Sequence, residues 1–136
     1  MRLKNPRTCT TESAASFIKR KEMVFLHDSK LIKMKDIGRK GKFYFRRQAW
    51  TFLPQSNLDE KVFIFERLEK VKYTGKLAYG ETWKRGELEY RIGYFIVGRN
   101  GRTKGKWVWG QFCSLIPADD LSKLLEKARA KKVLLD

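Results

Sequence analysis

The chain has 136 residues, a length typical of one domain and sufficient to bury a core. Its 42% hydrophobic content excludes wholesale disorder, and no apolar run approaches the roughly 20 residues that a membrane-spanning helix needs. Its net charge of +16 far exceeds the magnitude of about 2–8 that keeps a small domain soluble. The excess favours a polyanionic partner, most simply nucleic acid, with an acidic protein or an anionic membrane surface as alternatives.

Residues 1–9 are polar and basic, and we expect a flexible arm there, followed by a single domain over residues 10–136. No apolar segment follows the basic start, so a secretory signal is not expected and a cytoplasmic location is the default. Cys9 and Cys113 are the only cysteines, which favours free thiols. With one histidine, His27, the chain has too few Cys and His ligands for a zinc site, so no metal or other cofactor is expected.

The first third of the domain combines a weak helix signal with short strand signals. Residues 10–20 predict a short helix, because a threonine is available to cap its start and Phe17 and Ile18 belong to a small apolar face. The apolar runs 23–27 and 31–35 each predict a short strand.

Two long strands are predicted in the middle of the chain. A basic turn at 38–41 precedes an aromatic-rich strand at 43–53, which stops at Pro54. Residues 61–73 predict the second strand. Its start, residues 62–65, is apolar on both faces, which indicates a central position in a sheet.

A hairpin is the clearest unit of the sequence. Strands are predicted at 88–97 and 106–112, on either side of a loop at 98–105 that is rich in glycine and cations. Asn100 and Gly101 suit a type I′ turn, in which both central residues have positive φ.

The register of that turn decides which aromatic residues share a face. It places Phe95 opposite Lys106, and Trp107 and Trp109 on the same face as Tyr94. These three rings are candidate stacking partners for bases: Tyr94, Trp107 and Trp109. Burial of the same face under a helix is the alternative, and we favour it.

A C-terminal helix follows Pro117, with Asp119 and Asp120 near its positive end. Its apolar stripe has helical spacing and consists of Leu121, Leu124, Leu125 and Ala128. The predicted fold is therefore α+β. It has roughly five antiparallel strands in an open or barrel-like sheet, this helix packed on one face, and a short N-terminal helix as an optional element.

The candidate contacts to nucleic acid are cations in two basic segments. Such side chains, together with the backbone N–H groups of glycine-rich turns, can bind phosphates, and solvated turns are the alternative. The hairpin loop does not have the spacing of a nucleotide-binding phosphate loop. The candidates are Arg39, Lys40, Lys42, Arg46 and Arg47 in the first segment and Arg99, Arg102, Lys104 and Lys106 in the second.

Catalytic signals are sparse, and no catalytic residue is assigned. A helix followed by an antiparallel sheet is also the layout of small metal-independent ribonucleases and toxin-type nucleases, which pair a Glu or His base with Arg or Lys. His27, Glu81, Glu87, Glu89 and Arg91 are the residues available for such a site. Surface charges are the simpler interpretation of these five.

Taken together, the sequence predicts a non-catalytic domain that binds the phosphate backbone of nucleic acid through basic loops. The ribonuclease or toxin-like enzyme is one alternative. An interaction subunit of a nucleoprotein or acidic protein complex is the other. The choice between DNA and RNA and the oligomeric state stay open at this stage.

Overall fold

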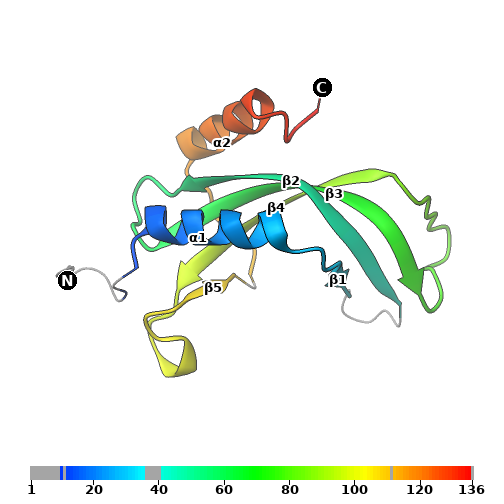
Figure 1. Cartoon of the computed structure of the whole chain (residues 1–136), viewed down its shortest axis with the longest axis horizontal. Helices are drawn as coiled ribbons and strands as arrows, with labels where there is room; N and C mark the ends of the chain where they lie inside the picture. The colour runs from blue at the N-terminus through cyan, green and yellow to red at the C-terminus, as the bar shows by residue number, and fades with distance from the viewer. Residues whose placement is uncertain (1–9, 11, 36–40, 111, 136) are drawn as a thin grey trace.

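The computed structural model describes residues 10, 12–35, 41–110 and 112–135. The helices and strands of this part of the chain follow one another as α1 (Ala14–His27), β1 (Ile32–Met34), β2 (Lys42–Pro54), β3 (Lys61–Thr74), β4 (Leu88–Val97), a 3₁₀ turn (Gly101–Thr103), β5 (Trp107–Trp109) and α2 (Ala118–Ala130). The strands form one sheet in the order β1-β2-β3-β4-β5, and each neighbouring pair is antiparallel (Figure 1). The predicted α+β fold is confirmed, including the central place of β3.

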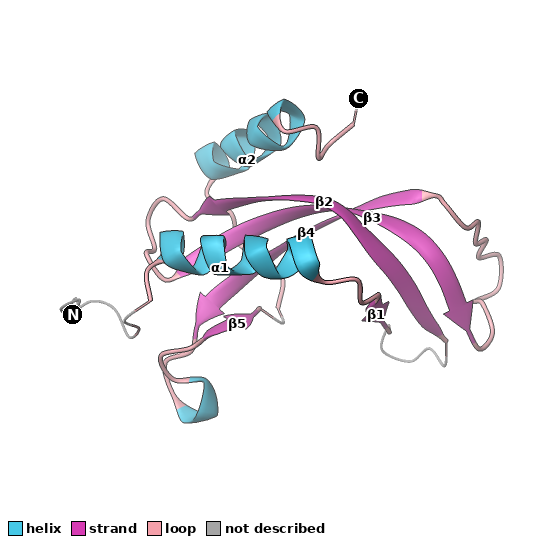
Figure 2. Cartoon of the chain, in the orientation of Figure 1, coloured by secondary structure: helices cyan, strands magenta, loops and turns pink. Residues whose placement is uncertain are grey.

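The two longest strands give the sheet its curvature. β2 and β3 pair from Lys42 opposite Thr74 to Pro54 opposite Val62, with irregularities next to Tyr44 and next to Arg47. Such bulges bend a strand and increase its twist. The sheet therefore curls into a half-barrel, with α1 on one side and α2 on the other (Figure 2).

The two helices cover opposite faces because β3 is apolar on both. Val62 and Ile64 pack with Phe17 of α1, whereas Phe63 and Phe65 alternate with them and pack with Leu124 of α2. A strand with two buried faces is possible only between two covering layers. α1, the sheet and α2 therefore form three layers.

Beyond the end of α1, the sheet carries a third apolar cluster. Phe43 and Phe45 of β2 and Leu68 of β3 are buried there, with Trp83 packed against them from the β3–β4 connection. No helix is part of this cluster, so a long connection takes over the covering role that α1 has on the other half of the face.

The N-terminal helix is longer than predicted and begins later. It spans α1, and its cap is Ser13, whose side chain accepts a hydrogen bond from the Ser16 N–H. The prediction of a strand at 23–27 is wrong, because these residues form the last turns of α1. Phe25 continues the apolar stripe begun by Phe17, whereas Leu26 is 65% exposed, so the run is not a buried strand.

The predicted type I′ turn does not form. Asn100 has extended backbone with a φ of −150°, whereas that turn needs positive φ at both central residues. The loop is widened by the 3₁₀ turn instead. Gly98 packs against the backbone of Thr103, where an added Cβ would lie 2.4 Å from the carbonyl oxygen, so this close approach requires glycine.

The wider loop shifts the register of β4 against β5. Phe95 pairs with Trp109 and Val97 with Trp107, so the predicted pairing of Phe95 with Lys106 is wrong. A shift by an odd number of residues moves a whole strand to the other face. Both tryptophans consequently share the face of Phe95, under α1, and not the face that α2 covers. β5 is also shorter than the predicted strand at 106–112.

The C-terminal helix agrees closely with the prediction. Pro117 is its N-cap, and Leu124 and Ala128 are fully buried against the sheet. Asp120 does more than complement the helix dipole, since its buried carboxylate accepts a hydrogen bond from the Ser56 N–H in the β2–β3 turn at 2.8 Å. This contact fixes the start of α2 to the rim of the sheet.

Candidate functional site

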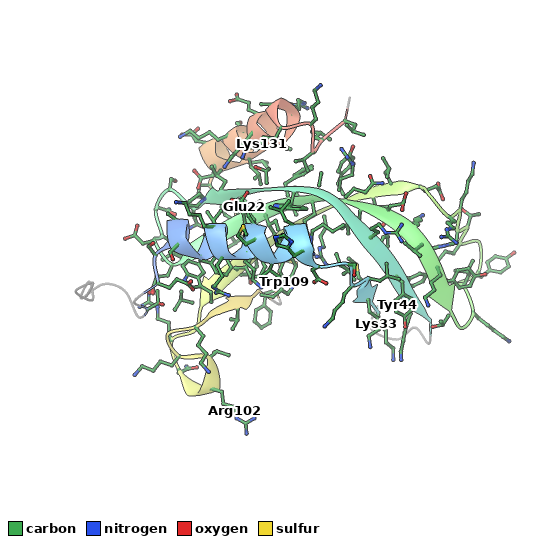
Figure 3. The ribbon with its side chains drawn as sticks, viewed as in Figure 1. Glu22, Lys33, Tyr44, Arg102, Trp109 and Lys131 are labelled. Atoms are coloured by element: carbon green, nitrogen blue, oxygen red, sulfur yellow. The ribbon has the colours of Figure 1, made fainter. Side chains whose placement is uncertain are left out.

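The hairpin loop presents one group of predicted cations. Arg102, Lys104 and Lys106 are exposed, and none of them has a carboxylate partner among the described residues. Arg99 differs, because its guanidinium lies 3.3 Å from the buried carboxylate of Glu60. Figure 3 shows Arg102 pointing away from the body of the molecule. Three of the four predicted loop cations are therefore available to a partner.

The other end of the sheet carries a second group, which we name the basic strip. Tyr44 of β2 pairs directly with Lys33 of β1 and with Lys72 of β3, and directly paired residues project from the same face. Residues two positions away on β2 share that face as well. The basic strip therefore consists of Lys33, Lys42, Tyr44, Arg46 and Lys72.

Most cations of the basic strip have no acidic partner. Arg46 forms an ion pair with Glu69 at 3.0 Å, whereas no described carboxylate lies within ion-pair distance of Lys33, Lys42 or Lys72. The Lys72 ammonium lies 5.0 Å from the centre of the Tyr44 ring. A half-buried aromatic ring thus stands among three lysines without counter-charge.

The two basic groups lie at opposite corners of the sheet. β1 and β5 are its two edges. The basic strip is at the Thr74 end of β3, and the loop is at the Lys61 end, where the Val97 N–H bonds to the Glu60 carbonyl. Lys61 and Lys72 are eleven positions apart on β3, which corresponds to roughly 35 Å along an extended strand. They do not form one continuous footprint (Figure 3).

Two predicted contacts, Arg39 and Lys40, lie outside the described residues.

Arg47 does not belong to either basic group, although the sequence analysis placed it with the first. Its Nε donates to Glu66 at 2.7 Å, and Nε of Arg91 donates to the other oxygen of the same carboxylate at 2.8 Å. Glu66 is fully buried. The two guanidinium groups stack over aromatic rings, Arg47 over Phe25 and Arg91 over Trp109. These three residues form a structural ion triad. Arg47 is engaged in it and is therefore not available to bind a phosphate.

The three aromatic residues considered for base stacking have different surroundings. Tyr94 is 8% exposed and packs beneath α2. Trp107 stacks on Phe17 with ring centres 4.7 Å apart, and its indole N–H donates to a backbone carbonyl. Trp109 is 37% exposed but lies across Gly93, where an added Cβ would meet its ring at 2.2 Å. Only Trp109 keeps an accessible ring edge.

A pocket opens on the opposite face from the basic strip, at the same end of the sheet. Its volume is about 290 Å³, and it contains rings, one ammonium and two carboxylates. The lining residues are Met34, Phe43, Phe45, Lys70, Glu81, Thr82, Trp83 and Glu89. Lys70 and Trp83 are not among the residues predicted from the sequence, because a lysine on a strand and a tryptophan in a turn carry no local signal for such a site.

Lys70 is the central charge of this pocket. Its ammonium lies 3.3 Å from Glu89, 3.5 Å from Glu87 and 5.1 Å from the centre of the Trp83 ring. Burial works against the charged form, but the two carboxylates outweigh it and raise the pKa of Lys70. The group is therefore an ammonium at neutral pH. The indole N–H of Trp83 is buried and has no acceptor among the described residues.

The residues considered for a ribonuclease do not assemble into one site. Glu81 and Glu89 line the pocket and Glu87 contacts Lys70, but Arg91 belongs to the Glu66 triad. His27 is exposed at the last residue of α1, and it has no hydrogen bond or ion pair within the described part of the chain. Within that same part, no cluster of three or more His, Cys, Asp or Glu is arranged to hold a metal ion.

Comparisons with known proteins add no assignment. No protein-family model matches the chain, and no curated protein or solved structure matches it either. Of the helices that the structure describes, none has the length and apolar character required to cross a membrane.

Proposed function

We propose that the protein binds single-stranded nucleic acid through the basic strip. The observation that carries the proposal is the position of Tyr44 between Lys33 and Lys72 on three adjacent strands. Cations bind the phosphates of a strand, and an aromatic ring stacks on its bases whatever their sequence. A ring flanked by lysines combines both contacts in one place.

Electrostatics support this placement. Lys33, Lys42 and Lys72 have no carboxylate partner among the described residues, so binding a phosphate does not require breaking an ion pair. Their spacing is set by paired strands, and a rigid arrangement loses little conformational entropy on binding. The net charge of +16 adds long-range attraction for a polyanion.

The basic strip is a better candidate than the hairpin loop. The loop has no aromatic residue, and Arg99 is already engaged by Glu60. We therefore expect the loop to contribute general attraction and the basic strip to hold the strand.

Two charge-reversal variants test this assignment. Lys33→Glu with Lys72→Glu alters the basic strip, and Arg102→Glu with Lys104→Glu makes the same change in net charge on the loop. Fluorescence anisotropy with a labelled single-stranded RNA and DNA measures the dissociation constants. The strip variant is expected to bind at least about tenfold more weakly than the loop variant.

Equal weakening in both variants would mean that net charge alone attracts the strand and would overturn the assignment to the basic strip. A stronger effect of the loop variant would move the binding surface to the loop. Absence of binding by the unaltered protein at low salt would overturn the proposed function itself, because electrostatic binding is strongest under those conditions.

A further inference from the structure

We infer that the pocket lined by Lys70, Trp83 and Glu89, named here the Trp83 pocket, binds a purine or pyrimidine ring. The inference deepens the proposed function, and it rests on that function where the ring is a base of the bound strand. The pocket can also bind the ring of a free nucleoside, so the pocket assignment and the proposed function can be tested separately.

The position of the Trp83 pocket relates it to the basic strip. Met34 lines the pocket and Lys33 belongs to the strip, and neighbouring residues of a strand project from opposite faces. The same alternation holds on β2, where Phe43 and Phe45 line the pocket on either side of Tyr44. Since β1 is an edge strand, a nucleic-acid strand that crosses this edge can place phosphates on the strip and a base in the pocket.

The lining excludes several other classes of ligand. The ammonium of Lys70 is already paired with the carboxylates of Glu87 and Glu89, which disfavours a phosphate. An organic cation would compete with Lys70, whose ammonium already occupies the face of the Trp83 ring. A hydrocarbon chain would leave the charged groups desolvated without new hydrogen bonds. A neutral, planar and polar ligand remains.

A heteroaromatic ring satisfies the groups that are present. Three aromatic rings line the pocket, those of Phe43, Phe45 and Trp83, so a flat ligand meets aromatic walls. The carboxylate of Glu89 accepts hydrogen bonds from amino or ring N–H groups, and Lys70 donates to ring nitrogen or carbonyl oxygen. Bases carry both kinds of group.

The buried indole N–H of Trp83 favours a ligand most directly, because it has no acceptor among the described residues. Buried donors in proteins nearly always have an acceptor, and an unpaired donor costs free energy. A base that accepts this hydrogen bond, after a small shift of the Trp83 ring, would remove the cost. The volume of about 290 Å³ lies at the lower end of the range for small-molecule sites, as suits one ring system and not a whole dinucleotide.

The test compares oligonucleotides with and without bases. Isothermal titration calorimetry of the full chain measures binding of a single-stranded oligonucleotide and of an abasic analogue with the same number of phosphates. We expect the oligonucleotide with bases to bind about tenfold more tightly. Adenosine, guanosine, cytidine and uridine are titrated in parallel with ribose as control, and at least one nucleoside is expected to bind where ribose does not.

Matched variants assign the effect to the pocket. Trp83→Phe keeps a ring but removes the N–H, and the preference for bases over the abasic analogue is expected to fall several-fold, to the part that stacking on Tyr44 contributes. Trp109→Phe makes the same exchange outside the pocket and is expected to retain the preference. The comparison of nucleosides with ribose uses the unaltered protein, so it stands even if Trp83→Phe fails to fold.

The outcomes separate the two proposals. If both oligonucleotides bind equally and no nucleoside binds, the Trp83 pocket is not a base site and Tyr44 does not stack on bases, while binding of the strand through its phosphates stands. If nucleosides bind but neither oligonucleotide does, the proposed function fails and the pocket assignment stands. Loss of the preference in Trp109→Phe, with its retention in Trp83→Phe, overturns the assignment to this pocket.

Discussion

At the scale of single residues, Glu66 is the most deeply buried charged side chain of the described chain. Its carboxylate is fully buried and accepts one hydrogen bond from Arg47 of β2 and one from Arg91 of β4. Each guanidinium also covers an aromatic ring, so three strands, α1 and β5 meet at one ion triad. Removing one partner of such a triad leaves a buried charge without compensation, which is strongly destabilising.

Glu66→Ala is expected to lower the free energy of unfolding by about 3–5 kcal/mol, because it leaves two partly buried guanidinium groups without their counter-charge. Urea denaturation followed by circular dichroism measures the change. The matched control is Glu69→Ala on the same strand, whose ion pair with Arg46 is exposed and is expected to contribute about 0–1 kcal/mol. Similar losses in the two variants would show that the triad does not behave as a buried ion cluster.

At the scale of elements, α1 packs on the sheet through Phe17 and Phe25, and Phe17 is the more deeply buried of the two. Phe17 is fully buried and packs with Phe95 and Trp107 at ring-centre distances of 5.0 and 4.7 Å. The C-terminal part of the helix also carries exposed apolar side chains, with Met23 56% and Leu26 65% exposed. Apolar residues of α1 are therefore not all buried. Because exposed and buried apolar residues follow one another at 23–27, this run resembles a buried strand in the sequence.

Phe17→Ala is expected to destabilise the protein by about 3–5 kcal/mol, since it removes a ring from a closed aromatic cluster. Leu26→Ala on the exposed side of the same helix is the control, with an expected change within about 0.5 kcal/mol. Thermal unfolding followed by circular dichroism compares the two. A large loss in Leu26→Ala would indicate that the exposed side of α1 is covered by another part of the chain or by a second copy.

At the scale of the whole molecule, the positive charge is divided between two remote surfaces. The basic strip and the hairpin loop occupy opposite corners of the sheet, and the cation Arg47 is internal to the fold. The net charge of the chain does not show which of the two surfaces contacts the phosphates. The slope of log K against log salt concentration does show it when each surface is altered in turn, because the slope is proportional to the number of phosphates that the protein neutralises.

Replacing Lys33, Lys42 and Lys72 by Ala is expected to make the slope of log K against log salt concentration less steep by about 2, since each contact to a single strand contributes about 0.7. The corresponding replacement of Arg102, Lys104 and Lys106 serves as control and is expected to leave the slope nearly unchanged. Fluorescence anisotropy over a series of salt concentrations gives both slopes. An unchanged slope in the strip variant would contradict direct phosphate contacts by these lysines.

The sequence by itself determined the fold class, the central position of β3 and the C-terminal helix. These features depend on local patterns: an apolar run on both faces of one strand, or leucines spaced by three and four residues before a buried Ala128. Two of the cations in the basic strip, Lys42 and Arg46, were also among the predicted contacts. Their neighbours Lys33 and Lys72 were not, because they come from other strands.

Only the tertiary structure decided the rest. The register of β5 depends on how the 98–105 loop closes, and one odd-numbered shift moved Trp107 and Trp109 to the other face. The basic strip and the Trp83 pocket each combine residues from β2 and β3 that are more than 20 positions apart in the chain. Strand pairing and sheet curvature bring such residues together, and neither is encoded in a local pattern. The sequence therefore determines the elements and the total charge, whereas the pairing of the strands determines where that charge and the pocket lie.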